Sequence, residues 1–166
     1  MVKRPVIKDL FFWLLFTASL LIIAARILFI SPVVVSGSSM EPTLNSGDRG
    51  FILKSTKEIA VGDIIVFHYD DRELIKRVIA LPGDTVQISG SRVLVNNEPL
   101  VEDYLITYPE ATTFVPNEGA TLTVPENELF VLGDNRLNSN DSRRIGTIPL
   151  EDVLGKVAFL YSFTFY

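Results

Sequence analysis

An almost unbroken apolar run over residues 10–30 limits the folds open to this chain more than any other part of its sequence. A helix of about 20 residues is about 30 Å long, which matches the hydrocarbon core of a bilayer. We therefore predict a single transmembrane helix at residues 10–30, between a short tail (residues 1–9) and a folded domain (residues 31–166). The part of the 166-residue chain that follows the run is long enough for one domain.

Three basic residues, Lys3, Arg4 and Lys8, precede the apolar run. The positive-inside tendency therefore predicts a cytoplasmic tail and a domain on the extracytoplasmic side of the cell membrane. The alternative is a cleavable secretory signal. The run is longer than the usual apolar region of such signals, about 7–15 residues, and no A-x-A cleavage site follows it. An uncleaved, single-pass anchor is the interpretation that we adopt.

Composition narrows the function classes. The net charge is −5 and no basic patch is visible, so nucleic acid is not an expected partner. The chain has one histidine and no cysteine, which leaves only carboxylates as metal ligands, and we predict neither a metal site nor a cofactor. The single histidine and the absence of cysteine also limit the kinds of hydrolytic active site that the chain could form, because serine and cysteine nucleophiles most often rely on a histidine base.

After residue 30 the sequence changes to short segments rich in Val, Ile and Phe, bounded by Gly, Pro, Asn and Asp, which is typical of strands. Asn96 and Asn97 predict a hairpin turn. At most one helical turn is expected, at residues 151–154. We predict a mainly β, antiparallel domain, barrel-like or built of two packed sheets, with a small β insertion at roughly residues 90–127. The predicted strands are residues 33–35, 50–53, 63–67, 74–80, 85–88, 92–95, 128–132 and 156–160.

A candidate nucleophile, Ser39, lies where the apolar run gives way to the domain, in the sequence Ser-Gly-Ser-Ser-Met-Glu-Pro-Thr-Leu (residues 36–44). Small residues before a serine let backbone N–H groups approach a ligand closely. The alternative is a serine-rich linker. A linker has no reason to carry the Met-x-Pro-Thr-Leu sequence that follows, so we favour the catalytic interpretation.

A candidate base, Lys76, stands between Leu74 and Val78 on one face of a predicted strand. Apolar neighbours desolvate the amine and favour its neutral form, which can accept the proton of a serine hydroxyl. The alternative is an edge-strand lysine that discourages aggregation. Arg77 points to the opposite face and is expected to be ion-paired, because arginine keeps its charge wherever it lies.

A polar loop at residues 133–143, Gly-Asp-Asn-Arg-Leu-Asn-Ser-Asn-Asp-Ser-Arg, follows the predicted strand 128–132. Its composition alone is that of an ordinary turn. Its acidic and arginine residues indicate that ion pairs fix this loop: Asp141 is expected to pair with Arg143, and Asp134 with Arg77. The lone histidine, His68, leaves a Ser-His-Asp triad as an alternative, because triads are defined by geometry rather than by sequence position.

In this order, the three segments resemble the sequence boxes of the type I signal peptidases (leader peptidases), which are membrane-bound serine proteases with a Ser–Lys dyad. Residues 39–44 match the nucleophile motif, residues 76–84 match the box that holds the lysine base, and residues 133–143 match the third box. The resemblance covers nearly all of the chain from the apolar run to residue 156.

The resemblance implies that Ser39 is the nucleophile, that Lys76 is the general base, and that Ser139 hydrogen-bonds Lys76 and orients it. It gives the two acid–arginine pairs a structural role. Gly37 stands where some members have a serine whose hydroxyl helps to form the oxyanion hole. The Ser39 N–H is then the main donor, with Gly37 and Ser38 beside it. Met40 is expected to contribute to substrate binding.

The implied function is that of a serine endopeptidase that removes N-terminal signal peptides from exported preproteins through an acyl-enzyme. Its partners would be the lipid bilayer and preproteins with small residues, typically alanine, at positions −1 and −3. Three alternatives remain: a dedicated maturation peptidase with one or few substrates, a non-catalytic membrane-anchored domain that binds peptides, and a Ser–Lys autoprotease of the repressor type. The predicted anchor, and the lack of a DNA-binding helix pair in the sequence, disfavour the last.

Overall fold

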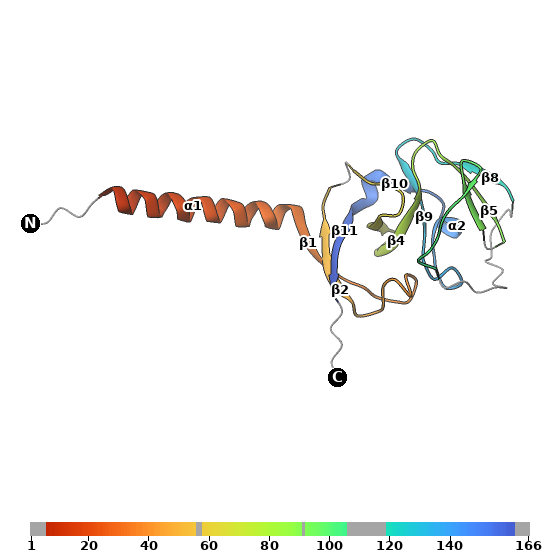
Figure 1. The fold of residues 1–166 in the computed structure, drawn as a ribbon, viewed down its shortest axis with the longest axis horizontal. Helices are drawn as coiled ribbons and strands as arrows, with labels where there is room; N and C mark the ends of the chain where they lie inside the picture. The colour runs from red at the N-terminus through yellow and green to blue at the C-terminus, as the bar shows by residue number, and fades with distance from the viewer. Residues whose placement is uncertain (1–5, 56–57, 91, 106–118, 162–166) are drawn as a thin grey trace, which may run out of the picture.

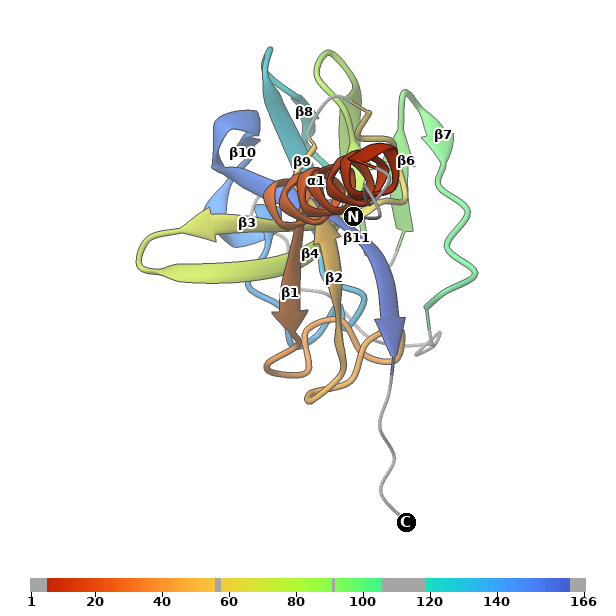
Figure 2. The same cartoon turned by 90° about the vertical axis from the view of Figure 1, so that its left-hand side faces the viewer.

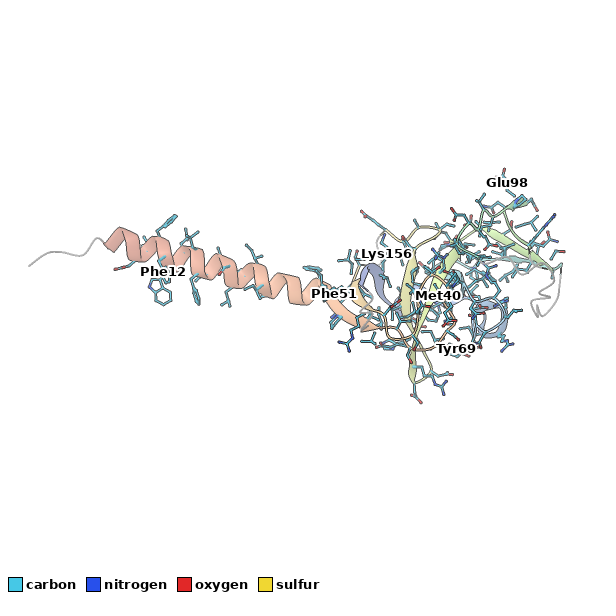
Figure 3. The ribbon with its side chains drawn as sticks, turned by 60° about the horizontal axis from the view of Figure 1, so that its bottom comes forward. Phe12, Met40, Phe51, Tyr69, Glu98 and Lys156 are labelled. Atoms are coloured by element: carbon cyan, nitrogen blue, oxygen red, sulfur yellow. The ribbon has the colours of Figure 1, made fainter. Side chains whose placement is uncertain are left out.

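The computed structural model describes residues 6–55, 58–90, 92–105 and 119–161, as a long N-terminal helix followed by a β domain (Figure 1). Helix α1 (Val6–Phe29) extends away from that domain. Its large apolar side chains from residue 10 to residue 23 are half exposed or more, and Phe12 projects from the helix (Figure 3). The run predicted as an anchor is thus helical. Within the residues that the structure describes, no helix meets both the length and the apolarity needed to cross a membrane.

The β domain contains two antiparallel sheets. The order of the seven-stranded sheet is β1 (Ile30–Val34), β2 (Arg49–Leu53), β11 (Val153–Tyr161), β3 (Ile64–Tyr69), β4 (Arg72–Ala80), β9 (Glu128–Leu132) and β10 (Ile148–Pro149). The order of the four-stranded sheet is β7 (Glu98–Pro99), β6 (Arg92–Val95), β5 (Thr85–Ser89) and β8 (Thr121–Thr123). Each segment predicted as a strand is a strand, so the mainly β, antiparallel class is confirmed. The view along α1 shows the β3–β4 hairpin projecting from the larger sheet (Figure 2).

The barrel-like closure predicted from the sequence is wrong for the described strands. In the larger sheet β1 and β10 are the two edges and do not pair with each other. The β10 edge is two residues long, and Pro149 has no N–H with which to continue a ladder. The sheet therefore stays open at this end.

Local sequence explains the smaller sheet and the short helices. Asn96 and Asn97 both have positive φ, which the tight turn between β6 and β7 requires and asparagine tolerates. The β5–β8 sheet comprises residues 85–99 and 121–123, while residues 106–118 of the predicted insertion lie outside the described part.

Asp141 caps α2 (Ser142–Ile145), a helix that the sequence did not predict. The expected single helical turn is η1 (Leu150–Asp152).

Strand β4 lies between two hydrophobic cores, and this decides the environment of Lys76. Val78 packs into a core with residues of β3 and β9, whereas Ile79 packs on the other side with residues of β5 and β6. Neighbouring residues of a strand face opposite sides of its sheet, so every residue from position 76 to 80 is buried. Lys76 begins this buried stretch and is itself buried.

Candidate active site

Ser39 lies in the turn that follows β1, and the packing of the next residue holds that turn in place. Met40 is almost fully buried in a small core with Val35 and Leu44. The Leu44 N–H donates to the Met40 carbonyl at 2.9 Å. Gly37 has φ of 87°, a conformation that favours glycine, and its N–H donates to Ser46 Oγ at 3.3 Å. The side chain of Met40 anchors the turn, and Ser39 is left at its surface.

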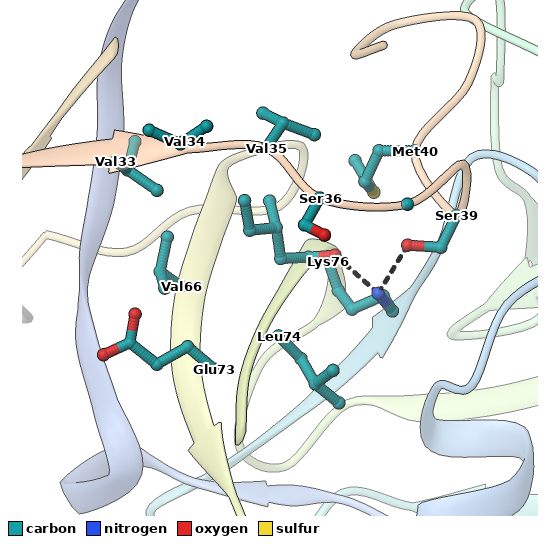
Figure 4. Close-up of a pocket in the computed structure, with 12 residues that line it drawn as sticks. Val33, Val34, Val35, Ser36, Ser39, Met40, Val66, Glu73, Leu74 and Lys76 are labelled. Carbon is teal, nitrogen blue, oxygen red and sulfur yellow. Dashed lines mark hydrogen bonds between the residues drawn. The ribbon is translucent and has the colours of Figure 1, made fainter. Parts of the chain in front are cut away.

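Lys76 of β4 reaches the hydroxyl of Ser39. Its Nζ donates to Ser39 Oγ at 2.8 Å and to the Ile75 carbonyl at 2.7 Å (Figure 4). The two residues are 37 positions apart in the chain, and Lys76 is 2% exposed. A nucleophile and a base must lie within hydrogen-bond reach for proton transfer, and this pair does. Ser39 Oγ therefore pairs with Lys76 rather than with His68, which is exposed on β3.

The surroundings of Lys76 set its protonation. Burial lowers the pKa of Lys76 from 10.5 to about 8, because an ammonium loses hydration in the protein interior. The negative charges of Asp141 and Asp134 oppose this change without cancelling it. A substantial share of the amines is therefore neutral near pH 8, and a neutral amine can act as a base.

The loop at residues 133–143 packs directly under the dyad. A Cβ at Gly133 would lie 2.2 Å from Ser139 Oγ and 2.5 Å from the Ser39 carbonyl oxygen, so only glycine fits there. Ser139 is buried, and its Oγ makes no hydrogen bond of ordinary geometry with any described atom, although it helps to lower the pKa of the nearby Asp141. The hydrogen bond expected between Ser139 and Lys76 is not among those of the described residues, so this role stays a prediction.

Two buried acid–arginine pairs fix this loop. Arg77 donates to Asp134 through Nε at 2.9 Å and through Nη2 at 2.6 Å. Arg143 donates to Asp141 in the same two-pronged way, at 2.8 and 2.7 Å. Burial alone would raise the pKa of Asp141, but Arg143 and the Gly133 N–H hold it below its ordinary value. The Asp141 carboxylate therefore stays charged near Lys76.

Sequence reasoning missed four contacts that support the site. Asn135 donates from its N–H to the Ser39 carbonyl at 3.0 Å, and from Nδ2 to the Ser38 carbonyl at 3.0 Å. Asn138 Nδ2 donates to Ser38 Oγ at 2.8 Å. The ring of Tyr104 stacks 3.9 Å from the Arg77 guanidinium carbon. Both asparagines lie in the loop that the sequence singled out, but nothing in their spacing distinguished them from ordinary turn residues.

A pocket of about 90 Å³ adjoins the dyad, between the end of β1 and the start of β4. Its walls are mainly apolar, with Glu73 at its edge (Figure 4). Met40 is among the lining residues, although its side chain is almost fully buried, and its role in substrate binding stays a prediction. The pocket is lined by Val33, Val34, Val35, Ser36, Gly37, Ser39, Met40, Val66, Glu73, Leu74, Ile75 and Lys76. Among the described residues, no group of three or more metal-ligating side chains could hold a metal ion.

Backbone donors are free beside Ser39. The Gly37 N–H is engaged by Ser46, and Ser38 Oγ accepts a hydrogen bond from Asn138. The N–H groups of Ser38 and Ser39 donate to no acceptor in the part of the chain that the structure describes. Of the predicted oxyanion residues, Ser38 and Ser39 thus have a free N–H, and that of Ser39 lies on the residue whose hydroxyl pairs with Lys76.

Comparison with known proteins identifies the family of this chain. The family described as "Signal peptidase, peptidase S26" matches residues 8–162. Signal peptidase I U of Bacillus subtilis (strain 168) is 35% identical to the chain, covering 96% of this chain and 90% of the relative. Signal peptidase I of Bacillus caldolyticus is 38% identical, covering 90% of this chain and 88% of the relative. Probable signal peptidase I-1 of Synechocystis sp. is 37% identical, covering 89% and 79%.

A solved structure gives the same answer for the fold. The crystal structure of a signal peptidase I from Enterococcus faecalis V583 superposes with a TM-score of 0.54 at 33% sequence identity. It covers 63% of this chain and the whole of the solved chain. The chain therefore belongs to the signal peptidase family, peptidase S26, and is a serine endopeptidase of the signal peptidase I type.

Proposed function

We propose that this chain is a membrane-anchored endopeptidase that removes N-terminal signal peptides from exported preproteins, with Ser39 as nucleophile and Lys76 as general base. One observation carries the proposal: the amine of a buried lysine lies 2.8 Å from a serine hydroxyl, and its pKa is lowered to about 8. A lysine kept for stability would gain nothing from this position, because burying an ammonium costs free energy.

Acylation follows from this geometry. Neutral Lys76 takes the proton from Ser39 Oγ while Oγ forms a bond to the scissile carbonyl carbon. The carbonyl oxygen becomes negative and accepts a hydrogen bond from the Ser39 N–H. The carbon–nitrogen bond then breaks, the leaving amine takes the proton back from Lys76, and the signal peptide stays esterified to Ser39.

Deacylation uses the same pair. Lys76 is neutral again after the first half-reaction and takes a proton from a water molecule, whose oxygen attacks the ester carbon. The ester bond to Ser39 Oγ breaks and Oγ recovers a proton from Lys76. The enzyme returns to its starting state without a cofactor, and we expect Ser139 to hydrogen-bond the Lys76 amine and orient it during this cycle.

Two free strand edges border the pocket. Among the described strands β1 pairs only with β2, and β4 pairs with β9 from Arg77 onward, so residues 72–76 of β4 have one edge that no described strand pairs with. An extended peptide between these edges gains backbone hydrogen bonds, with alternate side chains facing the pocket. A pocket of about 90 Å³ has room for a side chain of the substrate, and the small residues expected at positions −1 and −3 are what the family resemblance implies.

Helix α1 supplies the membrane part of the proposal. Its apolar side chains are exposed and find no cover in the β domain, so contact with lipid removes them from water. Its 24 residues reach about 36 Å. The N-terminal cations favour a cytoplasmic tail, which would place the active site on the extracytoplasmic side. Part of that tail, residues 1–5, lies outside the described residues.

The test is cleavage of a preprotein with an A-x-A site by the full-length chain in liposomes. Ser39→Ala and Lys76→Met should each abolish processing and keep the fold, while His68→Asn, the matched control, should process at the wild-type rate. A wild-type rate for Lys76→Met would refute the dyad. A panel of unrelated preproteins separates a general peptidase, which cuts most of them, from a dedicated one. Protease protection of the two ends reports whether α1 spans the bilayer and in which direction.

A further inference from the structure

The two asparagines of the 133–143 loop hold the backbone on both sides of the nucleophile. Asn135 binds this turn twice, through its N–H to the Ser39 carbonyl and through Nδ2 to the Ser38 carbonyl, each at 3.0 Å. Asn138 adds a third hydrogen bond, 2.8 Å long, to Ser38 Oγ. The partners are nearly a hundred positions apart in the chain, so these bonds exist only once the two segments have come together.

The geometry of the peptide unit gives these bonds a catalytic consequence. The Ser38 carbonyl and the Ser39 N–H belong to one planar, trans peptide group, so they point in opposite directions. A donor that fixes the carbonyl therefore fixes the direction of the N–H. The Ser38 carbonyl has two such donors, Asn135 Nδ2 at 3.0 Å and the Glu41 N–H at 3.2 Å.

The N–H at the other end of this unit is free to bind a ligand. In the described chain the Ser39 N–H donates to no acceptor, and it lies on the residue whose hydroxyl pairs with Lys76. Hydrogen bonds to a developing negative charge accelerate a reaction only when the donor is already aimed before the charge forms. Whatever holds the Ser38–Ser39 peptide unit in place thus contributes to the rate.

We infer that Asn135 is a positioning residue that aims the Ser39 N–H at the oxygen that becomes negative during acylation, with Asn138 securing the same turn through Ser38. This inference rests on the proposed function of the dyad. Removing an oxyanion donor outright costs about 10²- to 10³-fold in rate. Loosening the aim of a donor that is still present should cost less, about ten- to a hundredfold.

The test uses the full-length chain in detergent and a short peptide boronic acid with an alanine-like side chain next to boron. Ser39 Oγ adds to boron, its proton passes to Lys76, and boron becomes a tetrahedral anion with one oxygen facing the Ser39 N–H. Asn135→Ala should bind this probe about ten- to a hundredfold more weakly. The kcat for a preprotein should fall by a similar factor, with KM unchanged, because the ground-state carbonyl gains little from the aim of the donor.

Two further readouts separate positioning from a general structural effect. The pH midpoint of acylation should stay at the wild-type value, because Asn135 does not hydrogen-bond Lys76 in the described structure. The affinity for the cleaved signal peptide, which has no tetrahedral centre, should not change. Asn140→Ala is the matched control: Asn140 is exposed in the same loop, and this variant should behave as wild type in every assay.

A second variant keeps the inference open to refutation if Asn135→Ala does not fold. Asn138 is exposed, so Asn138→Ala should fold normally and bind the boronate a few-fold more weakly. Wild-type boronate affinity in a folded Asn135→Ala or in Asn138→Ala would overturn the inference, as would equal losses for the boronate and the cleaved peptide. The probe needs no signal peptide. A wild-type enzyme that binds the boronate and cuts no preprotein would therefore refute the proposed substrate while the comparison of variants still decides the role of Asn135.

Discussion

The rate of acylation should rise with pH through the titration of Lys76, and the structure gives the midpoint. In the proposed mechanism neutral Lys76 is the active form, and burial lowers its pKa to about 8. Below that value kcat/KM should fall about tenfold for each pH unit, and above it the rate should be level. At pH 7 about one amine in ten would be neutral, against about one in three thousand for an unperturbed lysine of pKa 10.5.

The assay is kcat/KM for a fluorogenic A-x-A peptide, measured with the full-length chain in detergent from pH 5.5 to 10. His68→Asn is the control, because a histidine base would place the midpoint near pH 6.5. The dyad predicts the same midpoint, near 8, with and without His68. A midpoint near 6.5 that disappears in His68→Asn would refute the assignment of Lys76. So would a rate that still rises steeply at pH 10, because the amine would then be unperturbed.

Three more predictions concern stability and packing. Gly133→Ala should destabilise the fold by about 1–3 kcal/mol and lower kcat, because the new Cβ meets the Ser39 carbonyl; urea unfolding and peptide cleavage check both effects. Lys76→Met should be more stable than wild type at pH 7. The difference in unfolding free energy between the two proteins should shrink by about 3 kcal/mol between pH 8 and 10.5. The reason is that the amine loses its proton at lower pH in the folded protein than in the unfolded chain, so wild-type stability rises over this range. A difference that does not change with pH would contradict the pKa of about 8. Asp141→Asn should cost about 3–5 kcal/mol in thermal or urea unfolding, because it leaves the buried guanidinium of its partner uncompensated. Asp63→Asn, in a partly exposed pair, should cost less than about 1 kcal/mol, and equal costs for the two variants would count against burial as the cause.

Much of the fold follows from local sequence. Short β-branched segments between turn residues give the strands, and Asn96-Asn97 gives its hairpin because asparagine tolerates positive φ. The closure of the larger sheet was predicted wrongly, since it depends on how β10 ends at Pro149 rather than on any strand by itself. Helix α2 is four residues long and exists because Asp141 caps it, which is too weak a signal to predict.

The candidate site could also be predicted only in part from the sequence. Ser39 and Lys76 were predicted because the three sequence boxes together resemble those of the signal peptidases, whereas a lone lysine in a strand is usually an edge residue. The roles of Asn135 and Asn138 were not predictable, because each depends on a contact between segments nearly a hundred residues apart. Ser139 is a second example of this limit. Sequence similarity identifies the residue, but only the coordinates show that its Oγ has no hydrogen-bond partner of ordinary geometry among the described atoms.

The junction between α1 and β1 has a consequence for where a substrate is cut. The helix ends at Phe29 and the strand begins at Ile30, with no loop between them. The Lys54 N–H donates a hydrogen bond to the Phe29 carbonyl at 2.9 Å. Only ten positions separate that carbonyl from the reactive hydroxyl at Ser39, half of them in a strand paired along its whole length. If α1 is the membrane anchor that we propose, this short and paired connection limits how far the reactive hydroxyl can lie from the lipid. A substrate held in the same bilayer would then be cut at a set height above the lipid, whatever the length of its own apolar segment.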